Sequence, residues 1–60
     1  MVNLKEKREE KGFTQQQLAD EVGVWRSTIA MIETGINKPS VPLAQKIASI
    51  LGFNWTEFFE

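Results

Sequence analysis

The chain of 60 residues contains no cysteine and no histidine. Without these side chains it can form neither disulfides nor thiolate or imidazole metal sites, and histidine-based catalysis is excluded. A glycine-rich phosphate loop is missing as well, so we expect no cofactor, no metal site and no enzymatic activity. The fold must rest on its apolar core, and a chain this short buries only about 60% of the surface that its unfolded form exposes.

Long apolar runs are also lacking, since no stretch of the sequence approaches the roughly 18 residues of a membrane span. The first eleven residues are charged, which does not match a secretory signal. Together with the absence of cysteine, this predicts a cytoplasmic protein without membrane contact. The composition, 42% hydrophobic with both signs of charge, is typical of a globular chain, and its length allows one domain over residues 1–60.

The sequence has no excess of positive charge, because seven basic and eight acidic side chains give a net charge of −1. Residues 1–11 carry four of the basic groups against three glutamates, while residues 12–60 carry three basic and five acidic groups. Any surface of this chain that binds an anion must therefore be sparse in charge.

The chain does contain residues that begin and end helices, namely capping side chains and glycines, at intervals along its whole length. Each of the four glycines follows a segment with helical periodicity, where a left-handed residue can end the helix. Ser40 is suited to cap a helix that carries Pro42 in its first turn. Three other starts have a capping-box pattern: Asn3 with Glu6, Thr14 with Gln17, and Asn54 with Glu57. These signals predict an all-α fold of five helices, near residues 4–11, 15–22, 26–34, 41–51 and 55–59.

The helix expected over residues 26–34 has an unusual outer face. At about 100° per residue, Ile29 and Ile32 share the inner face. The opposite face carries small or uncharged side chains: Ser27, Ala30, Met31 and Thr34. A solvated helix usually fills its outer face with Glu and Lys, so this face is either kept clear for a contact or is simply a poorly charged surface.

Two stretches, FTQQQLADEVGVWRSTIAMIETG and NKPSVPLAQKIASILGF, resemble the helix-turn-helix domains of phage repressors and Cro, the xenobiotic-response-element family of bacterial regulators. The resemblance covers residues 4–59. It implies a compact lambda-repressor-like domain whose recognition helix, residues 26–34, enters the major groove of double-stranded DNA. It further implies a small transcriptional regulator, with repression as the expected role, that binds an operator of two half-sites as a homodimer.

The resemblance also assigns roles to individual residues. Positions that read or approach base edges in the family match Arg26, Ser27, Ala30, Met31 and Thr34. Positions near the DNA phosphates match Gln15, Gln16, Asn37, Lys38 and Ser40. A helix-one arginine pairs in the family with the glutamate that ends the recognition helix, which here predicts an ion pair between Arg8 and Glu33 instead of two solvated charges.

These contacts have alternatives that the sequence leaves open. Arg26 is the strongest base-reading candidate, because its planar guanidinium group can donate hydrogen bonds to guanine O6 and N7 at the same time. Gln15 can bind a phosphate, brace the recognition helix or remain a solvated first-turn residue. Lys38 can be an ordinary loop lysine, and Met31 an isolated apolar group on the surface.

Residues 41–59 carry more apolar groups than the core needs. The helix expected over residues 41–51 is expected to bury Val41, Ala44, Ile47, Ala48 and Leu51. The surplus groups are Leu43, Ile50 and Phe59. They form either a dimer patch or the edge of a wide core stripe.

The negative net charge and the apolar NWTEFF segment favour an alternative function, a protein-interaction module of a regulatory or antitoxin-like complex with weak DNA binding. We expect no domain for a small-molecule ligand.

Trp25 departs from the family, which has Ser or Thr where the recognition helix begins. The helix therefore lacks a side-chain acceptor for its first amides, at a cost of about 1 kcal/mol if water does not substitute fully. The ring can fold over Val24 and Ile29 as a lid on the core. Alternatively, its indole N–H can reach a DNA phosphate, or the ring can contact a partner protein.

Overall fold

Four α-helices and a terminal 3₁₀ helix form the fold, in a computed structural model that describes residues 2–60. In chain order they are α1 (Leu4–Glu10), α2 (Gln15–Val22), α3 (Arg26–Glu33), α4 (Val41–Leu51) and η1 (Trp55–Phe59). The all-α prediction is confirmed, and no strand is present between residues 2 and 60. The expected count of five α-helices is slightly off, because the last segment has only five residues and adopts the tighter 3₁₀ geometry common in short segments.

Capping side chains fix where the helices begin. Thr14 Oγ1 accepts a hydrogen bond from Gln17 N at 3.0 Å, and Gln17 Oε1 accepts one from Thr14 N at 2.8 Å, which completes the capping box of α2. Asn54 and Glu57 form a second complete box at η1. Asn3 caps α1 through Glu6 N at 3.0 Å, but the exposed Glu6 carboxylate does not return the bond. The expected box at α1 is thus only half formed, since an exposed carboxylate gains little by exchanging water for an exposed amide.

A tight turn at Gly23 sets α3 against α2. Gly23 has a φ of +76°, in the left-handed region that favours glycine, and its N–H donates to Ala19 O at 2.8 Å. Ala19 itself is fully buried where the two helices pack together. A small side chain there lets the helix axes approach closely, so the turn and this contact together define the direction of α3.

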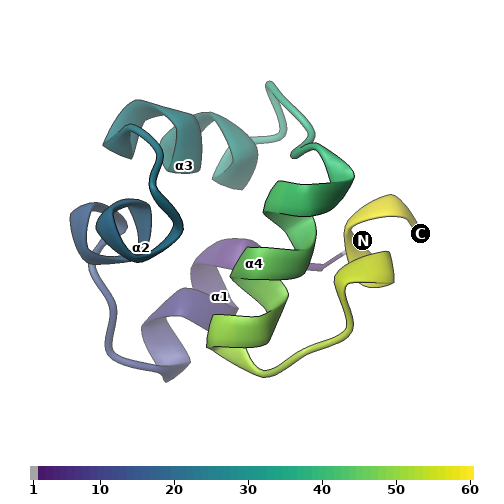
Figure 1. Ribbon diagram of the computed structural model, residues 1–60, viewed down its shortest axis with the longest axis horizontal. Coiled ribbons are helices and arrows are strands. Elements are labelled where there is room, and N and C mark those ends of the chain that lie inside the picture. Colours follow the sequence, from purple (N-terminus) through teal and green to yellow (C-terminus); the bar gives the residue numbers. More distant parts are fainter. Residues whose placement is uncertain (1) are drawn as a thin grey trace.

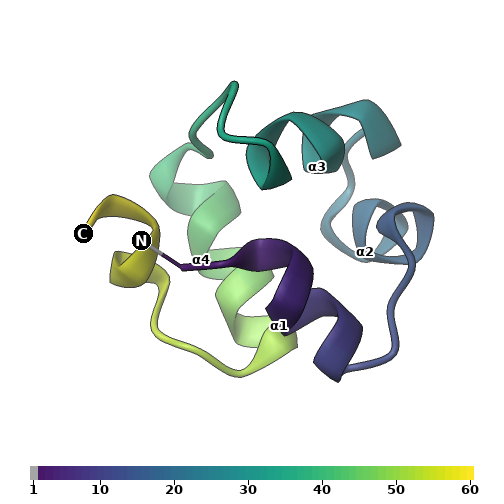
Figure 2. The ribbon, with the colours of Figure 1, turned by 180° about the vertical axis from the view of Figure 1, so that it is seen from behind.

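The core lies where α1 to α4 and η1 converge. α2, α3 and α4 each contribute one fully buried large side chain: Leu18, Ile29 and Ile47. The rings of Phe53 and Phe58, whose centroids are 5.4 Å apart, close the core beside η1. Val2 N donates to Glu57 O at 3.1 Å, so the first described residues lie beside η1, on the side of the molecule away from α2 (Figures 1 and 2).

The apolar residues of α4 divide differently from the expectation. Val41 is 46% exposed, so its predicted place in the buried face is wrong. It occupies the first turn of α4, before the helix passes between the other elements, and the buried residues of α4 begin at Ala44. Leu43 and Ile50 are half-buried against the core, whereas Phe59 is 42% exposed.

In the described part of the chain, no helix has both the length and the apolar character needed to cross a bilayer.

Candidate nucleic-acid interface

α3 lies along one edge of the molecule, with one face in the core and the other in solvent (Figures 1 and 2). Ile29 and Ile32 anchor its inner face, with exposed fractions of 0% and 9%. Of the residues expected to meet bases, Arg26, Ser27 and Thr34 are exposed, and Ala30 and Met31 are half-buried. An α-helix with its side chains is about 10–12 Å across. A helix presented in this way fits the major groove, which is about 12 Å wide.

An ion pair connects the end of α3 to α1. Arg8 Nε donates to Glu33 Oε2 at 2.6 Å, and Arg8 Nη2 donates to Glu33 Oε1 at 3.3 Å. The two side chains are only 9% and 4% exposed, and Arg8 Nη1 also donates to Phe13 O at 2.7 Å. The structure thus brings together the two residues that the resemblance pairs. The hydrogen bond to Glu33 raises the pKa of Arg8 above its already high ordinary value, so Arg8 keeps its charge at any pH of practical interest.

Gln15 extends this ion pair toward the solvent-exposed end of α3. Its Nε2 donates to Glu33 Oε1 at 3.0 Å, and its Oε1 accepts from Arg26 Nη1 at 3.4 Å. Of the alternatives that the sequence leaves open for Gln15, these contacts match the brace of the recognition helix. Gln16 is exposed and donates to Asp20 Oδ1 at 2.9 Å along α2. A shallow depression beside the start of α2 is lined in part by Gln15, Gln16 and Arg26, so these three residues share one surface.

The loop after α3 folds back on the end of the helix. Asn37 N donates to Met31 O at 3.3 Å, and Asn37 Nδ2 lies 3.5 Å from Met31 Sδ. Lys38 and Ser40 are both exposed, and Ser40 Oγ accepts from Leu43 N at 3.3 Å as the cap of α4. The Ser40 hydroxyl therefore keeps its proton for another acceptor.

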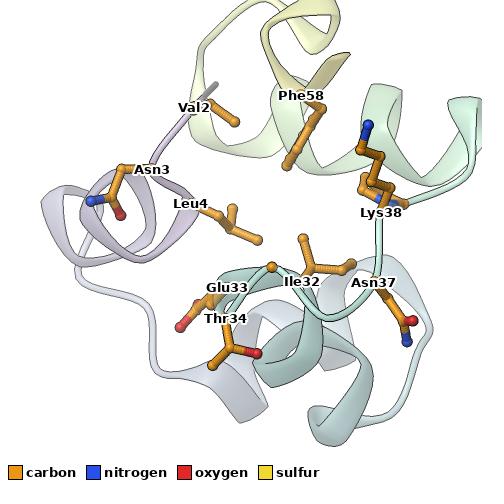
Figure 3. A pocket seen from close by; sticks show the side chains of 11 residues that line it. Val2, Asn3, Leu4, Ile32, Glu33, Thr34, Asn37, Lys38 and Phe58 are labelled. Carbon is orange, nitrogen blue, oxygen red and sulfur yellow. The ribbon is translucent and has the colours of Figure 1, made fainter. Parts of the chain in front are cut away.

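A pocket of about 350 Å³ lies behind this loop, between α3 and η1. Figure 3 shows Val2, Leu4, Ile32 and Phe58 pointing toward its centre, whereas Thr34 and Asn37 point away from it. The floor of the pocket is therefore apolar. Among residues 2–60, no three His, Cys, Asp or Glu side chains are grouped so that they could hold a metal ion.

Trp25 does not form a lid on the core. Its side chain stands in solvent with 81% of the residue exposed, and it accepts no capping hydrogen bond. The interpretation as a lid is wrong, because the ring stays in solvent while Val24 remains half-buried and Ile29 is fully buried by its other neighbours. The exposed ring suits the two other roles, a contact with the DNA backbone or a contact with a partner protein.

Ile36 is an exposed apolar residue that the sequence patterns do not predict. Ile36 follows the helix-ending Gly35 and is 71% exposed, although its N–H donates to Met31 O at 3.0 Å. An apolar residue directly after such a glycine usually packs back against the helix, so the sequence gives no signal that this one stays in solvent. Trp25 and Ile36 thus place exposed apolar groups beyond both ends of α3.

Comparisons with known proteins agree with this architecture. A family model described as helix-turn-helix matches residues 4–58. The chain is 51% identical over 57 residues to the uncharacterized HTH-type transcriptional regulator YqaF of Bacillus subtilis, covering 95% of this chain and 75% of that protein. It is 49% identical over 49 residues to an uncharacterized HTH-type transcriptional regulator of Methanothermobacter thermautotrophicus, covering 82% of this chain and 71% of that one.

A longer relative shares the same segment. The HTH-type transcriptional regulator SlrR of Bacillus subtilis is 39% identical over 54 residues, which is 88% of this chain but 36% of SlrR. These matches agree with the packing of α2 and α3 across the turn at Gly23. The chain belongs to the helix-turn-helix family of the phage repressor and Cro type.

Proposed function

We propose that this chain is a DNA-binding transcriptional regulator, without enzymatic activity, that acts as a repressor from the cytoplasm. Residues 1–60 serve as one DNA-binding domain, and α3 is the recognition helix. The observation that carries the proposal is the arrangement of α3. Its inner face and its terminal Glu33 are fixed to the rest of the fold, and its outer face presents Arg26 with small neutral side chains to the outside. Relatives named as transcriptional regulators support it.

The base-reading contacts of the proposal centre on Arg26. Its exposed guanidinium lies at the start of α3 and can hold guanine O6 and N7 in a bidentate contact. Met31 meets a thymine methyl group, and Ser27 hydrogen-bonds either partner of a base pair. Ala30 and Thr34 line the approach to the groove.

Phosphate contacts flank α3 on two sides. On the side of α2 they come from Gln15, Gln16 and Trp25. On the side of the loop they come from Asn37, Lys38 and Ser40. Counterion release depends on the phosphates that cationic side chains neutralise, and Lys38 is the only cation among these six residues. Two domains that each neutralise one or two phosphates, through Lys38 and at most Arg26, give a slope of log affinity against log salt concentration of about −2 to −4. A measured slope steeper than about −8 would contradict this set of contacts.

The proposal includes a homodimer on two half-sites about one helical turn apart. The dimer patch consists of Leu43, Ile50 and Phe59. The exposed ring of Phe59 supports the patch most directly, and the half-buried Leu43 and Ile50 contribute their outer edges. Edge contact with Trp55, at a centroid distance of 6.2 Å, holds the Phe59 ring at the surface.

Selection of bound sequences from a random pool of duplex DNA tests the function directly. We expect enrichment of a two-fold symmetric sequence with a guanine in each half-site. A symmetric site supports the dimer, a single half-site contradicts it, and recovery of no sequence at all contradicts specific DNA binding.

A second function is favoured by the exposed apolar residues Trp25, Ile36, Val41 and Phe59 together with the net charge of −1. These features suit a protein-interaction module of a regulatory or antitoxin-like complex that binds DNA only weakly. Titration with random duplex DNA at low salt separates the two functions, because a DNA-binding domain retains weak non-specific affinity there. Absence of that affinity favours the interaction module.

A further inference from the structure

We propose that the pocket between α3 and η1 binds a small carboxylic acid with a compact apolar body, and that the bound acid opposes DNA binding. The acid lies against the apolar floor of the pocket, with its carboxylate at the amino group of Lys38. The site itself is independent of the proposed function and belongs to this one domain. Only its effect on DNA rests on the proposed function, because Lys38 is one of the residues that we expect to contact a phosphate.

The pocket is enclosed by parts of the chain that are far apart in the sequence (Figure 3). Residues 2–4 form one side, the end of α3 and the loop over residues 35–39 form another, and Phe58 closes the space from η1. The volume of about 350 Å³ lies near the lower end of the range for small-molecule sites, which is about 300–1,000 Å³. A ligand of this site is therefore small.

The walls of the pocket are held in place before any ligand arrives. Leu4, Ile32 and Phe58 belong to the buried core, and Pro39 is buried shortly before α4 begins. The loop is also fixed to α3, because the N–H groups of residues 36 and 37 both donate to Met31 O, at 3.0 and 3.3 Å. A pre-formed apolar surface pays little to become ordered on binding, so it suits a rigid and compact apolar group.

The charged side chains around the pocket decide which kind of ligand fits. Only Glu33 and Lys38 line it with a charge. Both oxygens of the Glu33 carboxylate accept hydrogen bonds from Arg8, and Figure 3 shows this carboxylate pointing away from the centre of the pocket. Lys38 lies at the edge of the pocket, and within residues 2–60 the only ion pair joins Arg8 and Glu33. The charge that faces a ligand is thus positive, which selects an acid over an amine.

A carboxylate suits the single amino group of Lys38 better than a phosphate does. One ammonium group balances the one negative charge of an ionised carboxylate, whereas a phosphate carries more charge and accepts more hydrogen bonds. Thr34 and Asn37 do not supply further donors, because both side chains point away from the pocket in Figure 3. A charge that leaves water without a partner is costly, so the match of one cation with one anion favours a monocarboxylic acid.

The bound acid and DNA compete for the same amino group. Lys38 is the only cation in the loop over residues 35–39, and it is exposed. A carboxylate at its amino group neutralises the charge on which a phosphate contact depends. Coupling between two ligands is reciprocal, so an acid that weakens DNA binding is itself bound less tightly by the complex with DNA. The pocket therefore gives this domain a means to respond to a small acid.

Titration of the free protein with cyclohexanecarboxylate tests the site, and cyclohexylmethanol is the neutral ligand of the same shape. We expect the NMR signals of the methyl groups of Val2, Leu4 and Ile32 to shift, with an affinity in the millimolar range, as suits so small a ligand. The methyl signals of Ile50, which lines a separate depression beside α4, should stay in place, and equal shifts there would overturn the site. The acid should bind about fivefold more tightly than the alcohol, and equal affinities would overturn the assignment of charge.

Two pairs of variants distinguish the pocket from general adhesion to the surface. Lys38→Met should reduce the preference for the acid over the alcohol to within about twofold. Lys11→Met should keep the preference, because Lys11 is an exposed lysine that lies near Gly52 and does not line the pocket. Val2→Phe fills the pocket and should abolish binding of both ligands, whereas Val41→Phe adds the same ring outside the pocket and should leave binding unchanged.

Unchanged binding in Val2→Phe, or an unchanged preference in Lys38→Met, would overturn the site. If circular dichroism shows that Val2→Phe is unfolded, the preference measured in Lys38→Met decides the question alone. Lys38 is exposed, so its substitution leaves the core intact.

A measurement with DNA separates the regulatory effect from the proposed function. At constant ionic strength, saturation with the acid should weaken binding of the selected DNA site about fivefold, and saturation with the alcohol should leave it unchanged. If the acid binds in the pocket and the affinity for DNA does not change, the site stands and the competition is overturned. If the acid binds in the pocket but the protein binds no DNA, the site stands and the DNA-binding function fails.

Discussion

α2 and α3 have eight residues each and follow one another across a short turn, yet only the first turn of α2 has a side-chain cap. Thr14 and Gln17 close a complete capping box at the start of α2. Trp25, at the equivalent place in α3, provides no side-chain hydrogen bond and is 81% exposed. α3 is fixed instead at its far end, where Glu33 meets Arg8. α3, the helix proposed to meet DNA, is thus fixed by its buried face and by its C-terminal end. Its first turn has no side-chain cap and is open to solvent.

The largest expected effect comes from breaking the contact that holds the far end of α3. Arg8→Met leaves the Glu33 carboxylate, 4% exposed, without its charged partner. Removing one member of a buried pair costs about 3–5 kcal/mol of unfolding free energy. For 60 residues the total is about 3–9 kcal/mol, so much of the variant should be unfolded at 25 °C. Urea denaturation followed by circular dichroism measures the loss.

The double variant Arg8→Met with Glu33→Leu is the control for this prediction. It removes both charges and should recover most of the lost free energy, because apolar groups of similar volume often replace a buried ion pair at little cost. A loss below about 1 kcal/mol in Arg8→Met would mean that water reaches Glu33 and that α3 is not held at this end.

The turn between the two helices should give the next largest effect. Gly23→Ala places a side chain at a φ of +76°, which costs about 1–2 kcal/mol for an L-residue. An added Cβ would meet no atom within 4 Å, so the cost is backbone strain and not a clash. Thermal unfolding measures it, and a loss much greater than this range would reveal that the turn also governs how α2 and α3 pack.

The two helix starts can be compared directly by alanine substitution. Thr14→Ala removes the oxygen that accepts from Gln17 N and should cost about 1 kcal/mol. Trp25→Ala removes no capping bond and little buried area, so its effect should stay within about 0.5 kcal/mol. Chemical denaturation of both variants gives the comparison. Equal losses would show that Trp25 contributes to the start of α3 in a way that the structure does not reveal.

The sequence was sufficient for much of the fold because its signals are local. Each capping pattern lies within four residues, and each helix-ending glycine marks its own helix, so the boundaries follow without knowledge of the packing. Distinguishing an α-helix from a 3₁₀ helix over Trp55–Phe59 depends on a shift of hydrogen bonds by one residue, which these patterns do not encode.

The candidate site was less accessible from the sequence. Arg8 and Glu33 lie 25 positions apart, and the resemblance to a family was needed to pair them. The two contacts of Gln15 depend on where three helices place their side chains, and the exposure of Trp25 depends on how completely Ile29 is covered by other groups. Local patterns carry no information on such packing.

The last expected effect is a gain in stability and not a loss. Trp25→Ser supplies the missing acceptor at the start of α3 and should raise the unfolding free energy by up to about 1 kcal/mol, since little of the exposed ring is lost from the core. The same substitution weakens DNA binding if the indole contacts the backbone, and leaves it unchanged if the ring serves a partner protein. Quenching of Trp25 fluorescence by DNA, in a Trp55→Phe background, distinguishes these roles. A gain in stability with a loss of affinity would mean that α3 lacks a cap because the position is used for binding, whereas no gain would mean that water already satisfies its first amides.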